Sequence, residues 1–174
     1  MPGQNNLSCS APAFGKLSAE VLRMGKSIRF EARGTSMQPI LRDGDILVVA
    51  PMKAGRAKLG DVVLCQLTDE KLFVHRVIQR RTADEGIQYL IKGDHVIAPD
   101  GWISGDQVFG RVVSAERNNF HINMNNPILK LLGYSSIVRY HMEKRWGRTP
   151  FKHLQFIKHL PIFYRYLVQE EFNG

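Results

Sequence analysis

The sequence contains no apolar run of the roughly 18 residues that a membrane-spanning helix needs. Its first residues lack the basic stretch and apolar core that mark a secretory signal peptide. Cysteine is scarce, with only Cys9 and Cys65, and no zinc-site spacing of Cys and His is present. Zinc-finger, RNP and helix-turn-helix patterns are also missing. These absences predict a soluble cytoplasmic protein in a reducing compartment, without a metal, a cofactor or a nucleic-acid partner.

What the chain does contain is typical of one folded domain. Its 174 residues are 44% hydrophobic and 23% charged, which suffices for a hydrophobic core and excludes a disordered chain. The formal net charge of +8 favours acidic partners or an anionic membrane surface.

Short alternating or β-branched segments, bounded by Gly, Asp or Pro, run from residue 28 to residue 117 and predict strands. These segments are SIRFEARG, DILVVAP, GDVVLCQL, KLFVHRVIQRR, IQYLIKG and QVFGRVVSAER. A short helix should precede them, capped by Ser18 and ended by Gly25. The expected fold class is mainly β, a compact antiparallel β barrel or folded sheet.

The chain divides into three parts by composition. Residues 1–17 are rich in Asn, Ser, Pro and Gly and should be flexible, and residues 18–117 should form the β domain. Residues 118–174 show helical apolar spacing, interrupted at Gly133 and by later glycine and prolines, and carry eight Lys and Arg against three acidic residues. This basic helical segment could pack its apolar side on the domain, or contact a membrane surface or a partner protein.

A serine lies in the stretch GTSMQP, residues 34–39, just before a turn and an apolar strand. Ser36 is either an ordinary turn serine or a nucleophile, and a nucleophile would need a neighbouring base and an orienting group. His75 lies in the middle of a predicted strand, where side-chain alternation puts it on the same face as Phe73 and Val77. Imidazole suits the role of base because its free pKa of about 6.5 leaves it neutral at pH 7.

Two carboxylates, Asp94 and Asp100, stand in the glycine-containing stretch IKGDHVIAPDG after a predicted strand. Aspartates in such loops commonly stabilise turns. Either of them could instead orient the histidine ring and stabilise its charged form during a reaction.

Three stretches together, GTSMQPILRDGDILVV, GDVVLCQL with FVHRVI, and IKGDHVIAPDG, are similar in order and approximate spacing to the conserved boxes of type I signal peptidases. Their superfamily, the S24/S26 serine peptidases, includes the self-cleaving LexA-type repressors. The chain most resembles the endoplasmic-reticulum and archaeal type signal peptidases, which use serine and histidine where most bacterial members use serine and lysine. The resemblance covers about residues 20–117 and implies a fold of the signal peptidase/LexA peptidase type.

The resemblance also implies roles for particular residues. The catalytic candidates are Ser36 as the nucleophile, His75 as the general base, Asp100 as the group that orients the histidine, and Asp94 as a support. Asp94 would act through an ion pair with Arg76 or Lys92.

The oxyanion hole and the substrate-binding loop implied by the resemblance consist of Gly34, Thr35, Met37 and Pro39. Backbone N–H groups around Thr35 and Ser36, placed by the bend at Gly34, would be the oxyanion donors. Membrane signal peptidases carry a serine where Gly34 stands, so no side-chain donor is expected at that position.

Three functions fit these observations. The main expectation is a soluble serine endopeptidase that cleaves an extended peptide or precursor protein, held beside the strand predicted near residues 28–34. A LexA-type module that cleaves its own chain is an alternative, and a non-catalytic peptide-binding module on the same fold is another. Only about 27 residues precede the first strand, which disfavours a preceding helix-turn-helix domain.

Overall fold

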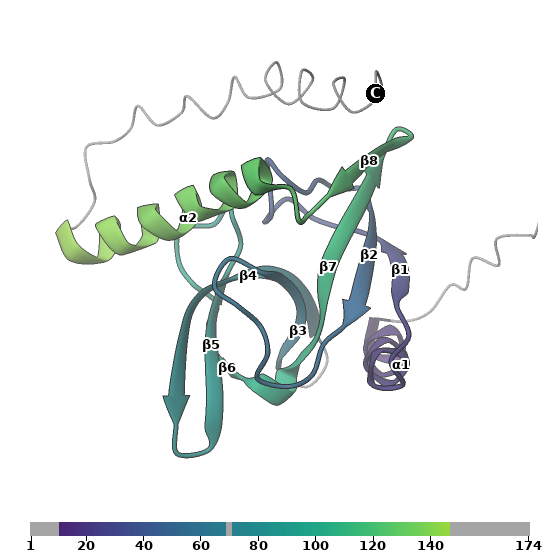
Figure 1. Ribbon diagram of the computed structural model, residues 1–174, viewed down its shortest axis with the longest axis horizontal. Coiled ribbons are helices and arrows are strands. Elements are labelled where there is room, and N and C mark those ends of the chain that lie inside the picture. The colour runs from purple at the N-terminus through teal and green to yellow at the C-terminus, as the bar shows by residue number, and fades with distance from the viewer. Residues whose placement is uncertain (1–10, 69–70, 147–174) are drawn as a thin grey trace, which may run out of the picture.

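The described residues form a curled antiparallel sheet, with one helix before it and one helix after it in the chain (Figure 1). The structure, a computed structural model, describes residues 11–68 and 71–146. In chain order the elements are α1 (Ala11–Arg23), β1 (Ile28–Glu31), β2 (Ile46–Pro51), β3 (Val62–Thr68), β4 (Lys71–Ala83), β5 (Gly86–Lys92), β6 (Gly101–Ser104), a 3-10 helix (Gly105–Gln107), β7 (Val108–Arg117), β8 (Phe120–Asn123) and α2 (Pro127–Trp146).

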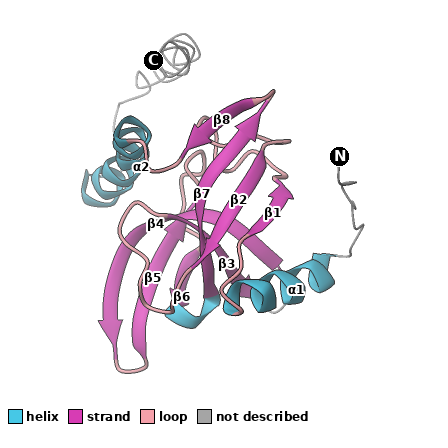
Figure 2. Ribbon diagram, turned by 45° about the vertical axis from the view of Figure 1, so that its right-hand side comes forward, coloured by secondary structure: helices cyan, strands magenta, loops and turns pink. Residues whose placement is uncertain are grey.

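The strands pair in the order β1-β2-β7-β3-β4-β5-β6, with β8 added beside β7, and every pair is antiparallel. Register shifts interrupt the pairing of β2 with β7, of β3 with both β4 and β7, and of β4 with β5. Such irregularities bend and twist strands, so the sheet curls into a half barrel (Figure 2). The predicted fold class, mainly antiparallel β, is confirmed.

Strand β3 is buried on both faces, and its alternating side chains divide the core in two. Val62 and Leu64 belong to a cluster that also contains residues of α1 and of the loop between β1 and β2. Val63 and Cys65 belong to a second cluster, which β4, β5 and β6 complete. Period-two alternation therefore lets one strand join both clusters.

Helix α1 begins at Ala11, seven residues before the predicted cap, so the prediction that Ser18 caps the helix is wrong. Ser18 is buried in the middle of the helix. The apolar stripe of the helix extends upstream to Phe14, whose ring packs edge-on against Phe30 at 5.3 Å between centroids. Residues 11–17, which the sequence predicted to be flexible, therefore belong to this helix.

The end of α1 follows the prediction. Gly25 has a φ of +79°, in the left-handed region where glycine is favoured. Its N–H donates to the carbonyl of Leu22 at 3.0 Å, and the N–H of Lys26 donates to that of Val21 at 3.2 Å. This pair of bonds satisfies the last carbonyls of the helix and stops it.

The sheet continues past residue 117, where the sequence predicted the β domain to end. Asn118 and Asn119 both have positive φ, 49° and 67°, and form the tight turn from β7 into β8. Strand β8 and the equally short β6 were not predicted as strands. Both have only four residues, and the flanking residues do not extend an alternating pattern as they do around the equally short β1.

Gly133 does not interrupt the C-terminal helix, contrary to the prediction, because α2 runs unbroken through it. A Cβ at this position would lie 2.4 Å from Nη1 of Arg76, so the glycine allows α2 to pack directly over that side chain. The other predicted interruptions, Gly147, Pro150 and Pro161, lie outside the described residues.

Candidate active site

The loop between β1 and β2, which carries Ser36, is shaped by a glycine bend and by buried side chains. Gly34 has a φ of +100°, and its N–H donates to Oδ1 of Asp43 at 2.7 Å across the loop. Met37, Ile40 and Leu41 are buried in the core cluster that includes α1. Ser36, which is half-buried, is thus held between the bend and an anchored segment.

The base of this loop is closed by a buried carboxylate, Asp45. Both of its oxygens accept hydrogen bonds from Arg117, each at 2.7 Å, and Oδ2 also accepts the N–H of Arg42 at 2.8 Å. Arg117 reaches further, to the carbonyl of Ile40 at 3.0 Å. This pair was not predicted, because 72 residues separate its members and an arginine at the end of a strand gives no sign of its partner.

Ser36, His75 and Asp100 form a continuous chain of hydrogen bonds. Nε2 of His75 lies 2.9 Å from Oγ of Ser36, and Nδ1 lies 2.7 Å from Oδ2 of Asp100. An ionised carboxylate can only accept, so Nδ1 carries the proton and Nε2 of a neutral ring is left to accept the serine hydroxyl proton. The structure therefore brings together three residues that stand far apart in the sequence.

The surroundings of His75 are apolar and closed. Its side chain is 5% exposed, while the Asp100 carboxylate is 22% exposed. The ring of Phe73 lies 5.6 Å from the imidazole, and Val77 belongs to the same buried cluster as the Phe73 side chain. The predicted shared face of these three residues is confirmed.

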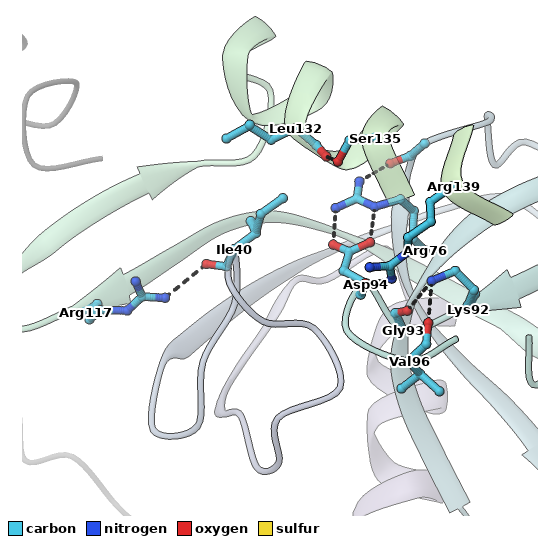
Figure 3. Close-up of polar contacts among 11 residues, drawn as sticks. Ile40, Arg76, Lys92, Gly93, Asp94, Val96, Arg117, Leu132, Ser135 and Arg139 are labelled. Carbon is cyan, nitrogen blue, oxygen red and sulfur yellow. Dashed lines mark hydrogen bonds and ion pairs between the residues drawn. The ribbon is translucent and has the colours of Figure 1, made fainter. Parts of the chain in front are cut away.

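Asp94 does not contact His75. Its carboxylate accepts Nε and Nη2 of Arg76 at 2.7 and 2.6 Å, and both side chains are buried. Arg76 also donates to the carbonyl of Gly60 at 2.6 Å, and Arg139 of α2 donates to the backbone carbonyl of Asp94 at 2.9 Å. Figure 3 shows this cluster lying beneath α2. Arg76, one of the two predicted partners, therefore forms an ion pair with Asp94.

The segment after β5 folds back on Ser36. Nζ of Lys92 donates to the carbonyls of Gly93 and Val96, both at 2.7 Å, which curls the chain (Figure 3). The N–H of His95 then donates to the carbonyl of Ser36 at 2.8 Å. Farther along, the N–H of Asp100 donates to a β5 carbonyl at 3.0 Å, so both ends of this loop are fixed.

Substituting Gly93 by Ala should displace the serine. A Cβ there would lie 2.7 Å from the carbonyl oxygen and 3.0 Å from Cβ of Ser36, closer than real contacts allow. We expect a loss of about 1–3 kcal/mol of unfolding free energy, measured by urea denaturation. Gly15→Ala is the matched control, because its Cβ would meet Leu72 at 3.6 Å inside a helix, and stability should stay equal or rise. Equal stability of the Gly93 variant and the wild type would contradict the close contact.

The predicted oxyanion and substrate loop is only partly available to a ligand. The N–H of Gly34 is occupied by Asp43, and the side chain of Met37 is 5% exposed, which leaves only its backbone for contact. Thr35 and Pro39 are exposed, the latter after a cis peptide bond. Within the described residues, the N–H groups of Thr35, Ser36 and Met37 donate no hydrogen bond, so the predicted donors Thr35 and Ser36 stay candidates for an oxyanion hole, and Met37 joins them.

Cys65 lies in β3 with its side chain fully buried, and its Sγ contacts the carbonyl of Phe73 at 3.6 Å. Burial, and secondarily the negative charge of Asp100, raises the pKa of this thiol far above its ordinary value. Because the thiolate is the reactive form, Cys65 should resist iodoacetamide at neutral pH in the folded protein and react in urea. Mass spectrometry of the peptide that contains Cys65 checks this. Equal labelling in both conditions would contradict it.

No group of three or more His, Cys, Asp or Glu side chains in residues 11–68 and 71–146 is arranged to hold a metal ion. In the same ranges, neither helix is both long and apolar enough to cross a bilayer. Two of the six histidines, His153 and His159, lie outside the described residues.

A curled antiparallel sheet that presents a serine, a histidine and an aspartate in one hydrogen-bond chain has the arrangement of a serine-peptidase-like domain. The family model described as Peptidase S24-like matches residues 12–113, more than half of the chain. The chain therefore belongs to the Peptidase S24-like family. A comparison with curated proteins found no match.

Proposed function

We propose that this protein is a serine endopeptidase with Ser36 as the nucleophile, His75 as the general base and Asp100 as the orienting carboxylate. The observation that carries the proposal is the hydrogen-bond chain of 2.9 and 2.7 Å that joins these side chains. A turn serine has no need of a buried histidine whose other nitrogen is bonded to a carboxylate.

The proposed reaction follows from this geometry. Oγ of Ser36 attacks the carbonyl carbon of a peptide bond while Nε2 of His75 takes the hydroxyl proton. The oxygen that becomes negative is stabilised by backbone N–H groups of the serine loop, with Thr35, Ser36 and Met37 as the candidate donors. His75 then gives its proton to the leaving amine, and a water molecule, activated by the same base, releases the acyl group from Ser36.

The substrate is proposed to be an extended peptide segment. Strand β1 ends the described sheet, because its only strand partner there is β2. An extended chain can therefore hydrogen-bond along its open edge and continue toward the serine loop that follows β1. The same arrangement accommodates a separate precursor protein or a segment of this chain.

A cleavage screen tests the proposal. The purified protein would be incubated with a diverse peptide mixture beside Ser36→Ala and His75→Ala, and peptide and protein masses would be followed together. Ser135→Ala and His121→Ala are matched controls, because both residues are exposed and lie on α2 and β8. We expect new peptide ends in the wild type and the controls that both active-site variants lack.

Other outcomes of the screen discriminate the alternatives. Trimming of the protein itself, without cleavage of added peptides, would identify a self-cleaving module. Cleavage that survives in Ser36→Ala would overturn the assignment of the nucleophile. An absence of both kinds of cleavage would favour a peptide-binding module.

A further inference from the structure

Helix α2 uses one side to pack on the sheet. Ile137 forms a buried cluster with Ile78 of β4 and Leu90 of β5. One turn earlier, Gly133 lies directly over the Arg76 guanidinium. This side of the helix is therefore packed against the sheet.

The opposite side of α2 is apolar as well, but it faces solvent. Leu131 is 69% exposed and Val138 is 55% exposed, and they stand seven residues apart, two turns along one side of the helix. Ile128 is also exposed by more than a third, as is Tyr134, whose hydroxyl donates to the carbonyl of Leu59 at 3.3 Å at the edge of the domain. We call these four residues the outer stripe. Exposed apolar patches of this kind commonly mark a site of interaction with a protein or a membrane.

The charges around the outer stripe are basic. Arg145 is exposed and stands seven residues after Val138, in line with the outer stripe. Lys130 and Lys144 are exposed in the neighbouring row that contains Ile137. Glu143 is the single acidic residue in the sequence of α2. Two copies that met through this face would bring like charges together, which opposes dimerisation. An anionic surface would instead attract the basic helix.

We propose that the outer stripe docks onto an anionic lipid bilayer, with α2 lying in the plane of the headgroups. Exposed aliphatic side chains on a helix rich in Lys and Arg are the features of helices that lie at this interface. The aliphatic side chains enter the acyl boundary, and the long basic side chains of the helix, Arg145 among them, contact the lipid phosphates. This binding does not depend on the proposed peptidase reaction.

Docking would also orient the candidate active site. Arg139 of α2 bonds the backbone of Asp94, in the same loop that carries Asp100. Ile97 of this loop is 70% exposed. Since α2 and the loop are joined by this bond, a docked helix holds the site at a fixed distance from the lipid surface.

Vesicle flotation with the full chain tests the proposal. The vesicles would be phosphatidylcholine alone, or equal parts of phosphatidylglycerol and phosphatidylcholine. We expect binding to the mixed vesicles only, weakened by added salt because salt screens the attraction. The double variant Leu131→Glu, Val138→Glu should bind about tenfold or more weakly, because it places two negative charges on the docking face.

Met24→Glu is the matched control, because Met24 is 68% exposed just after α1 and should leave binding unchanged. Circular dichroism and sedimentation would be measured on every variant. Three results would overturn the proposal: no binding by the wild type, equal binding to neutral vesicles, or equal binding by the double variant. A dimer that the double variant dissolves would assign the stripe to a second copy instead.

Discussion

Replacing Asp100 by Asn should lower the kcat of peptide cleavage by about 10⁴-fold while leaving the fold unchanged. The carboxylate accepts the proton on Nδ1 of His75 at 2.7 Å, which leaves Nε2 free to accept from Ser36. An asparagine amide can donate to Nδ1 instead and thereby favour the tautomer with its proton on Nε2. That tautomer cannot accept the serine proton, so the nucleophile is not activated.

Steady-state kinetics on a peptide from the cleavage screen would measure this effect, with urea denaturation to show that stability is retained. Asp84→Asn is the matched control, because Asp84 is exposed in the turn between β4 and β5. Its kcat should equal that of the wild type. An Asp100→Asn enzyme with undiminished kcat would remove Asp100 from the mechanism, although Ser36 and His75 could still act as a pair.

Replacing Arg76 by Met should cost about 3–5 kcal/mol of unfolding free energy. The change removes both side-chain donors to the Asp94 carboxylate and leaves that charge buried without its ion-pair partner. It also removes the bond to the Gly60 carbonyl. Since small domains are stable by only about 5–15 kcal/mol, much of the total would be lost.

The double variant Arg76→Met, Asp94→Leu shows whether the stability loss of Arg76→Met comes from the unpaired buried carboxylate or from a packing defect. With both charges replaced by apolar groups, stability should return close to that of the wild type. Urea denaturation followed by circular dichroism measures all three proteins. If the double variant were as unstable as Arg76→Met alone, packing beneath α2, and not the unpaired carboxylate, would be the cause.

The sheet was largely predictable because most of its strands have strong local signals. The segments that became β2 to β5 and β7 are β-branched and bounded by Gly, Asp or Pro. The errors lie where contacts outside the element decide the structure. The upstream extension of α1 depends on Phe14 meeting Phe30, and the continuity of α2 through Gly133 depends on Arg76 lying against it.

The candidate catalytic residues were predictable from the sequence. The hydrogen bonds that hold their loops in place were not. The three boxes suggested Ser36, His75 and Asp100, and side-chain alternation gave the face of His75. The pairing of Asp45 with Arg117 and the contact of His95 with Ser36 join residues from separate elements. Such contacts depend on the topology of the sheet, which a single sequence does not specify.

His75 and Arg76 are neighbours on β4, so their side chains lie on opposite faces of the sheet and serve different roles. His75 points to Ser36, and Arg76 points to Asp94. A shift of β4 by one residue would exchange these faces: in one direction it would place Arg76 beside the serine, and in the other it would place His75 beside the buried carboxylate. In evolutionary terms, the length of the chain between the start of β4 and His75 should therefore be fixed: a one-residue change turns His75 to the wrong face, and a two-residue change moves it about 6.6 Å along the strand, away from Ser36.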